Sequence, residues 1–475
     1  MSLLICGATI LDGVAESPLE DGSIWIENGR IRAIGRGLDS AVGGASLPAR
    51  TLDARGKYII PGLMDANVHL LADVRLENLA RYTGQYEDLI AEAAQVALKG
   101  GLTTVFDTWG PRRHLLNVRD QINAGVLPGS RIFFAGNIIG FDGPFSPDFF
   151  PKAIEVASSA WAHRINALWV ENVGRHLMWL PPEQVAAEVR AYLGKGIDFI
   201  KYASNDHAPG AFLAFSPQAQ AAMIEEAHRA GITAQAHTTS VEGLRIAVEA
   251  GCNLIQHANI TGPVPIPEST LELLASRKTG AVVFPLTQRR LEWFLEKADA
   301  ATRCMYSALD INTHALIRSG APLLMAWDSH LLAPEASSDP VWFWAKPSED
   351  SPHVLGQGHF AWFKAMEEKG FAPMQMLKAA TRNIAVAYGK DKDLGTLEPG
   401  KLADLVILNK DPLRSAANYR SIDLVIKEGV MVDRDKLPLK PVLTRPPDPA
   451  SAEETCYTPF LSPGRFPGCP ACGGR

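Results

Sequence analysis

The chain of 475 residues contains no apolar run near the roughly 20 residues that a helix needs to cross a bilayer. Its first residues, M-S-L-L-I-C-G-A-T-I, lack the basic segment that precedes the hydrophobic core of a secretory signal. Basic runs are absent too, and 46 Lys and Arg against 52 Asp and Glu leave a net charge of −6. We therefore expect a cytoplasmic protein that binds neither a membrane nor a nucleic acid.

Cysteine is scarce, and three of the six cysteines stand singly in apolar or helical contexts, as expected of small buried hydrophobes. Cys469 and Cys472 form C-P-A-C, but a lone pair of this kind does not complete a four-ligand zinc site. Proline is dense after Lys436 and periodicity disappears. We interpret residues 437–475 as a Pro/Gly-rich C-terminal tail, either laid over the surface or disordered.

Both ends of the remaining chain have the pattern of short β-strands. Residues 1–56 alternate polar and apolar side chains and turn at Gly or Asn-Gly, and residues 392–436 repeat this pattern. Two β-rich segments that flank a long middle region predict one small, discontinuous β-sandwich domain built from both ends.

The middle region, residues 57–391, alternates short apolar runs with amphipathic helical segments, which is typical of a parallel sheet. Eight strand–helix units in this length predict an α/β fold of the TIM (β/α)8 barrel type, the catalytic domain. The eight candidate strands are Leu63–His69, Thr103–Asp107, Arg131–Asn137, Phe199–Ala203, Thr233–His237, Leu254–His257, Ala281–Leu286 and Leu323–Asp328.

Polar side chains gather at the C-terminal ends of five of these strands, where a barrel builds its active site. They are Asn67 and His69 on strand one, then Lys201, His237, His257 and Asp328 on strands four, five, six and eight. A lone histidine at a strand end is more often a structural residue. Five matching positions instead favour a site for a divalent transition metal. Lys201 lies in the apolar run D-F-I-K-Y-A, where burial disfavours its charged form.

With these residues in place, the chain resembles the amidohydrolase superfamily. The likeness rests on P-G-L-M-D-x-x-x-H, on the strand-end lysine, histidines and aspartate, and on L-E-P-G-K-L-A-D-L-V-I-L near residue 400. It covers about residues 1–435 and implies a metal-dependent hydrolase with a β-sandwich companion domain. In the lysine-bearing branch, CO2 carboxylates the lysine, which then bridges two metals.

Carried over, the resemblance implies one metal held by Lys201, His237 and His257, and another held by His69, Lys201 and Asp328. Zinc is the expected ion, with cobalt, manganese or iron as alternatives.

One position departs from the family pattern. The first strand normally carries H-x-H, and here Asn67 takes the first position, where its amide is a poorer ligand than imidazole. We therefore expect one tight metal site and a weaker or empty second one. The N-x-H variant resembles the phenylurea hydrolases and molinate hydrolase.

The resemblance implies hydrolysis of a C–N bond, of the amide, urea or carbamate type, by hydroxide formed on the metal. Asp328 would act as the general base, the carboxylated Lys201 would take part in catalysis as the metal-bridging group, and His330 or His207 would assist the leaving group. Both of these histidines stand in predicted loops, where a solvated side chain is the alternative. A deaminase of the same superfamily usually lacks the lysine, so Lys201 argues against that function. A non-catalytic assembly protein is the other alternative.

Aromatic residues crowd the long connections after strands three and eight, and long βα loops carry function in barrels. We expect Phe141 and Trp169, together with Asn67 and His207, to bind a hydrophobic, aryl-containing small molecule. The alternative is a subunit interface of the expected homo-oligomer. The other aromatic residues of these connections are Phe145, Phe149, Phe150, Trp161, Trp179, Trp342, Phe343, Trp344 and Phe360.

Overall fold

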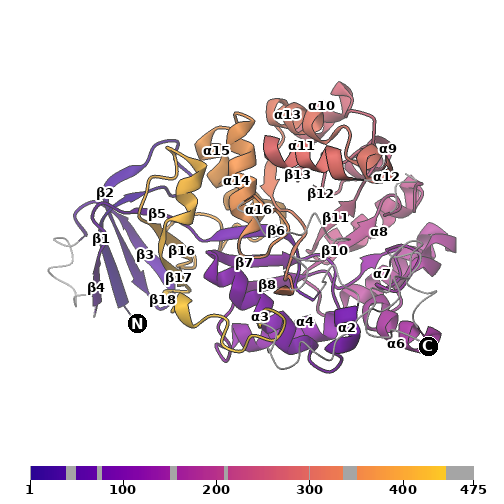
Figure 1. The fold of residues 1–475 in the computed structure, drawn as a ribbon, viewed down its shortest axis with the longest axis horizontal. Helices are drawn as coiled ribbons and strands as arrows, with labels where there is room; N and C mark the ends of the chain where they lie inside the picture. Colours follow the sequence, from indigo (N-terminus) through magenta and orange to yellow (C-terminus); the bar gives the residue numbers. More distant parts are fainter. Residues whose placement is uncertain are drawn as a thin grey trace, which may run out of the picture.

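The computed structural model describes residues 2–38, 50–71, 77–149, 158–207, 212–298, 300–334 and 350–445. A β-sheet domain made from both ends of the chain lies beside a larger body of strands and helices (Figure 1). Within these described ranges, no helix has both the length and the apolar character needed to cross a membrane.

The terminal domain is one branched eight-stranded sheet with the order β18-β17-β16-β5-β1-β2-β3, in which β4 also pairs with β1. It encloses a core of its own that includes Ile5, Ile24 and Leu405. β5 belongs to this sheet, although it follows the boundary predicted at residue 56; the division into domains stays a prediction. The strands are β1 (Ser2–Ile10), β2 (Leu19–Glu27), β3 (Arg30–Gly35), β4 (Arg50–Asp53), β5 (Tyr58–Pro61), β16 (Leu405–Leu408), β17 (Ile422–Lys427) and β18 (Val430–Met431).

The larger body holds two parallel sheets, of order β15-β6-β7-β8 and β14-β13-β12-β11-β10-β9. The chain runs from β8 into β9 and from β14 towards β15, so the same two segments border both sheets. This arrangement confirms an α/β fold with parallel sheets. The strands are β6 (Leu63–His69), β7 (Leu102–Asp107), β8 (Arg131–Phe134), β9 (Ile138–Ile139), β10 (Phe199–Ala203), β11 (Thr233–His237), β12 (Leu254–Gln256), β13 (Gly280–Val283), β14 (Leu323–Met325) and β15 (Ser329–His330).

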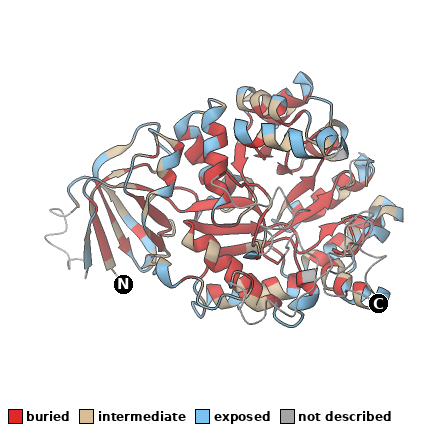
Figure 2. Cartoon of the chain, in the orientation of Figure 1, coloured by how far each residue is buried: buried red, intermediate tan, exposed pale blue. Residues whose placement is uncertain are grey.

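Helices pack around these strands with their polar faces outward, and the strands are buried (Figure 2). Their ends follow ordinary capping chemistry: Ser216 accepts a hydrogen bond from the backbone of Ala219, and Pro217 opens α8. The helices are α2 (Glu77–Arg81), α3 (Tyr86–Lys99), α4 (Arg112–Asn123), α6 (Ser159–Val170), α7 (Pro182–Leu193), α8 (Pro217–Arg229), α9 (Val241–Glu249), α10 (Glu268–Arg277), α11 (Gln288–Lys297), α12 (Ala300–Met305), α13 (Leu309–Ser319), α14 (Gly358–Glu368), α15 (Pro373–Ala379) and α16 (Arg382–Ala387).

Strands β12, β13 and β14 end earlier than the sequence predicts, and for β12 and β14 the reason lies in their backbone. His257, directly after β12, has φ of 37°, and Asp328, shortly after β14, has φ of 48°. This left-handed conformation is unfavourable for side chains other than glycine, and it cannot continue a strand. It turns these two side chains away from the alternation of the sheet.

The third strand is also interrupted, between β8 and β9. Gly136 adopts φ of 75°, and the hydroxyl of Tyr192 fills the break. That hydroxyl donates to the carbonyl oxygen of Ala135 and accepts from the backbone nitrogen of Asn137, both at 2.9 Å. Tyr192 therefore satisfies backbone groups that the sheet leaves unpaired.

The described part of the predicted tail, residues 437–445, lies against α3. The buried carboxylate of Glu92 accepts hydrogen bonds from the backbone nitrogens of Val442, Leu443 and Thr444, at 2.8–3.1 Å. Residues 446–475, with the C-P-A-C pair, lie outside the described residues.

Candidate metal centre and active site

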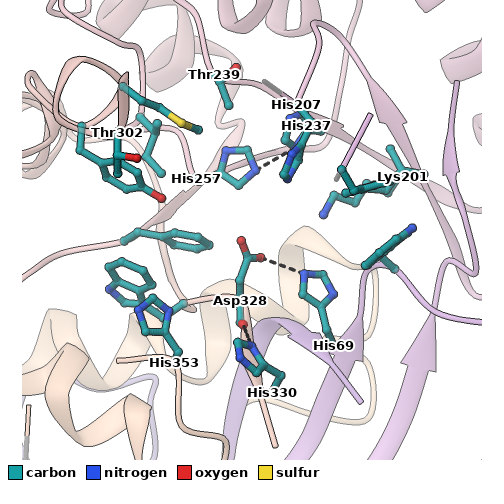
Figure 3. A pocket seen from close by; sticks show the side chains of 18 of the residues that line it. His69, Lys201, His207, His237, Thr239, His257, Thr302, Asp328, His330 and His353 are labelled. Carbon is teal, nitrogen blue, oxygen red and sulfur yellow. Dashed lines mark hydrogen bonds and ion pairs between the residues drawn. The ribbon is translucent and has the colours of Figure 1, made fainter. Parts of the chain in front are cut away.

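A cavity of about 440 Å³ opens at the C-terminal ends of the parallel strands, and the five predicted metal ligands line it together (Figure 3). His69 ends β6, His237 ends β11, and Lys201 lies within β10. His257 and Asp328 reach the cavity from the left-handed positions after β12 and β14. Five side chains that are far apart in the sequence thus face one space.

The two histidines of adjacent strands contact each other across the cavity wall. Nε2 of His257 lies 3.1 Å from Nδ1 of His237, and the rings meet edge to face with centroids 4.6 Å apart. Burial lowers the pKa of His257 to about 4 and holds that of His237 well below its usual value. Both imidazoles are therefore neutral at pH 7, the form that binds a metal.

Lys201 is buried in the sheet, with only 2% of its surface exposed. Burial lowers its pKa to about 8, against the opposing attraction of Asp328 and Asp107. A neutral amine is therefore far more accessible to Lys201 than to a lysine on the surface. The neutral amine is also the form that reacts with CO2.

Asp328 faces His69, whose Nε2 lies 3.4 Å from Oδ1 of the carboxylate (Figure 3). Burial opposes ionisation of this carboxyl group. The hydrogen bond from His69 and the charges of His69, Lys201 and His257 outweigh burial and hold the pKa of Asp328 well below its usual range. The group is ionised at neutral pH.

The donor set of the cavity fits a divalent metal. Among the five candidate ligands, three buried imidazole nitrogens have no hydrogen-bond partner within the described residues: His69 Nδ1, His237 Nε2 and His257 Nδ1. Unpaired buried donors and acceptors are costly unless a ligand or ion satisfies them. In the same part of the chain, no three His, Cys, Asp or Glu side chains are already gathered as a finished metal site.

Asn67 is fully buried and does not line the cavity. Its Nδ2 donates to Oε1 of Gln256 at 2.8 Å, and its Oδ1 accepts a hydrogen bond from the hydroxyl of Thr108. The amide oxygen and nitrogen are both engaged in the layer beneath the cavity.

The remaining predicted residues separate into two groups. His207, His330 and Trp169 line the cavity, and the ring of His207 stacks on that of His237 with centroids 5.3 Å apart. Phe141 lies behind the wall, with its ring edge-to-face to His237 at 5.5 Å. Burial lowers the pKa of His207 and of His330 to about 4, so both are neutral at pH 7.

The aromatic residues expected in the pocket are dispersed. Phe149 and Trp169 line the cavity, whereas Trp179 is 79% exposed and Phe145 packs against Trp161. Phe360 is buried beside the guanidinium of Arg420, outside the cavity lining. Four others lie outside the described residues: Phe150, Trp342, Phe343 and Trp344.

Several cavity residues escaped the sequence analysis. Trp109 stacks on Phe149 at 4.1 Å, and Trp327 stacks on Phe284 at 4.9 Å. Trp109 and Trp327 could have been predicted as cavity residues, because each stands at or just after the end of a predicted strand. Tyr306 reaches the cavity from the turn after α12, and no pattern in the local sequence predicts this position.

Comparison with known proteins decides the family. A model of the amidohydrolase family matches residues 58–432, most of the chain. The chain belongs to the amidohydrolase family. Members of this family hydrolyse carbon–nitrogen bonds and typically bind a divalent metal, so the protein is a hydrolytic enzyme acting on such bonds.

Comparison with individual proteins shows which amidohydrolases this chain is similar to. A solved structure of molinate hydrolase matches with a TM-score of 0.87 and 37% identity, over 94% of this chain and 98% of the other. Phenylurea hydrolase B also gives a TM-score of 0.87, with 34% identity over 94% of this chain and 100% of the other. Ochratoxinase of Aspergillus niger is 25% identical over 429 residues, 86% of this chain and 82% of the relative. The resemblance to molinate and phenylurea hydrolases is confirmed.

Proposed function

We propose that this amidohydrolase cleaves an amide, urea or carbamate-type C–N bond of a hydrophobic, aryl-containing small molecule, with a divalent metal and carboxylated Lys201. The observation that carries the proposal is the convergence of five predicted ligands on one cavity: His69, Lys201, His237, His257 and Asp328. We also propose that β6 to β15 close into a (β/α)8 barrel, since two continuous segments border both parallel sheets. The homo-oligomer expected from the sequence stays a prediction.

The residues of the cavity divide the chemical work. When bound, a divalent metal, with zinc as the first candidate, lowers the pKa of water and polarises the scissile carbonyl group. The ionised carboxylate of Asp328 accepts the proton of the attacking water and later delivers it to the departing amine nitrogen. His69 orients this carboxylate through its Nε2, and the backbone carbonyl of Asp328 fixes the ring of His330 at 3.0 Å.

The substrate class follows from the cavity wall. Beyond the ligands, most of the lining side chains are aromatic or aliphatic, and they include Trp109, Phe149, Trp169, Phe284 and Trp327. Flat apolar walls favour an aryl or otherwise hydrophobic group and exclude water from the reacting bond. The names of the two solved relatives, a molinate hydrolase and a phenylurea hydrolase, support a substrate of this kind.

Purified enzyme screened against ureas, carbamates, thiocarbamates, anilides and N-acyl amino acids tests the activity. Lys201→Met is expected to abolish turnover and to lower the metal content, with partial recovery by added short carboxylic acids. Asp328→Asn is expected to retain most of the metal and to lose several orders of magnitude in kcat. Full activity of Lys201→Met would remove the lysine from the mechanism, and wild-type protein without metal or turnover would favour an assembly protein.

One tight metal per chain is our second expectation, because the amide of Asn67 is engaged with Thr108 and Gln256 below the cavity. The variant Asn67→His adds an imidazole at this position and is expected to raise bound zinc or cobalt towards two per chain. Metal analysis of both proteins, prepared side by side with excess metal, measures the difference. Two tightly bound metals in the wild type would contradict the expectation.

A further inference from the structure

We infer that Thr108 is a positioning residue: it holds the side-chain nitrogen of Lys201 so that the nitrogen lone pair faces the cavity, where CO2 adds. The inference rests on the proposed function, since it assigns the device that prepares this lysine for carboxylation. Nζ of Lys201 donates to Oγ1 of Thr108 at 3.0 Å, its sole hydrogen bond within the described residues. Both side chains are buried, so water is excluded from this contact.

The direction of the hydrogen bonds below Thr108 is fixed by the layer of amides. The Nε2 group of Gln256 donates to Oε1 of Gln235 and to the carbonyl oxygen of Ala66, so Gln256 presents Oε1 upward. That oxygen accepts from Nδ2 of Asn67, which therefore presents its own Oδ1 to Thr108. Because the carbonyl oxygen of Ala66 can only accept, it fixes the amide orientation of Gln256, and the orientation of Asn67 follows from that of Gln256.

With the hydrogen bonds directed in this way, Thr108 can only accept a hydrogen bond from Lys201. A hydroxyl group has a single proton, and Thr108 gives it to Oδ1 of Asn67. Only oxygen lone pairs remain to face Lys201, so Thr108 accepts from the amine and cannot donate to it. The amine must turn an N–H towards Thr108, and its lone pair is directed elsewhere.

The same contact suits the product of carboxylation. The lone pair of the neutral amine forms a bond to the carbon of dissolved CO2, and one C=O electron pair moves to oxygen. A proton then leaves the nitrogen for water, and the product is Lys–NH–CO2⁻ with one N–H. Because the carbamate is planar by resonance, like a peptide, an N–H held by Thr108 also fixes the plane of its two oxygens. These oxygens are then directed away from Thr108, towards the cavity.

Asn67 gains a function by this reasoning. Its position in the family pattern suggests a metal ligand, whereas its contacts make it the acceptor that orients the hydroxyl of Thr108. The chain Gln256–Asn67–Thr108–Lys201 links strands β12, β6 and β10 with the residue directly after β7. Each member is buried and has its partner in the next one.

The test uses the zinc-loaded enzyme with 13C-labelled bicarbonate as the source of CO2, and 13C NMR measures the carbamate signal. Thr108→Val removes the acceptor at nearly constant volume. It is expected to raise the bicarbonate concentration for half-maximal carbamate by at least tenfold, about 1.4 kcal/mol, in the range of a hydrogen bond to a buried polar group. Thr108→Ser retains the hydroxyl and is expected to restore the wild-type value.

Thr239→Val is the matched control, because Thr239 lines the same cavity and bonds Asn205 rather than Lys201. It is expected to leave the bicarbonate titration unchanged. If Thr108→Val fails to fold by circular dichroism, Thr108→Ala replaces it in the same titration. A wild-type midpoint in the folded variant overturns the inference and leaves the proposed function intact. Wild-type enzyme without any carbamate overturns the carboxylated lysine itself.

Discussion

Arg131 is a buried cation that joins the terminal sheet to the α/β body. Loss of its carboxylate partner is expected to lower the free energy of unfolding. It starts β8, and its guanidinium contacts the carboxylates of Asp404 and Glu428 and the hydroxyl of Thr104. The side chains of Arg131 and Asp404 are 8% and 6% exposed, whereas Glu428 is 41% exposed. Asp404 is therefore the main buried counter-charge, and it stands in the L-A-D-L-V motif near residue 400.

The perturbation is Asp404→Ala. It leaves a buried guanidinium with a single, half-exposed partner, and it also removes the acceptor for the backbone nitrogen of Glu428 at 2.7 Å. Breaking a buried ion pair on one side costs about 3–5 kcal/mol. Asp404→Asn keeps an oxygen for that backbone nitrogen and is expected to cost about 2 kcal/mol, a charged hydrogen bond. The free energy of unfolding is measured by urea denaturation, with tryptophan fluorescence and circular dichroism as probes.

A double variant separates the ion pair from other effects. Arg131→Met with Asp404→Leu replaces both charges by apolar groups, and this exchange is expected to recover most of the lost stability. Neither residue lines the cavity, so kcat at low denaturant is expected to stay near the wild-type value. A loss below about 1 kcal/mol for Asp404→Ala would refute the reasoning, because it would mean that water already screens the pair.

Three further outcomes are expected. Glu171 directly follows α6, the helix that carries Trp169, and its carboxylate accepts hydrogen bonds from Arg112 at 2.7 and 3.2 Å. Glu171→Gln should therefore raise KM several-fold, and a fall in kcat alone would contradict this. Glu92→Ala releases residues 442–444 and should speed tryptic cleavage near the C-terminus; unchanged cleavage would contradict the anchor. Burial lowers the pKa of Lys201 to about 8. Labelling of metal-free protein by 13CO2 should therefore rise roughly tenfold per pH unit below pH 8 and level off above it. A flat profile between pH 6 and 8 would contradict a lysine that becomes neutral near pH 8.

The regular elements followed from periodicity alone. β6, β10 and β11 have the predicted bounds, because no left-handed residue interrupts their apolar pattern. Errors arose where side chains or backbone strain end a strand early, as at Tyr192 and at the left-handed His257 and Asp328. These causes depend on tertiary contacts, which the local pattern does not contain.

Most candidate ligands could be found because they lie at or shortly after strand ends, which topology alone brings to one edge of the sheet, whereas Lys201 was found as a lysine in the apolar run of β10. The wall of the cavity could not be found in this way. Tyr306 and Arg290 belong to the turn after α12 and to α11, segments whose path over the strand ends is not encoded by periodicity. Residues that act through side-chain partners were equally out of reach.

Asn67 belongs to both kinds of residue: its position on a strand could be predicted from the sequence, but its hydrogen-bond partners could not. Read as one letter in the family pattern, it looks like a lost metal ligand, because imidazole binds zinc-class ions better than an amide does. Its partners are Thr108 and Gln256, which lie 41 and 189 residues away in the sequence. An imidazole at this position could not donate to Gln256 and accept from Thr108 with the same planar geometry. The amide therefore belongs to a hydrogen-bond network that ends at Lys201. Its replacement should first alter the hydrogen bond between Thr108 and the side-chain nitrogen of Lys201.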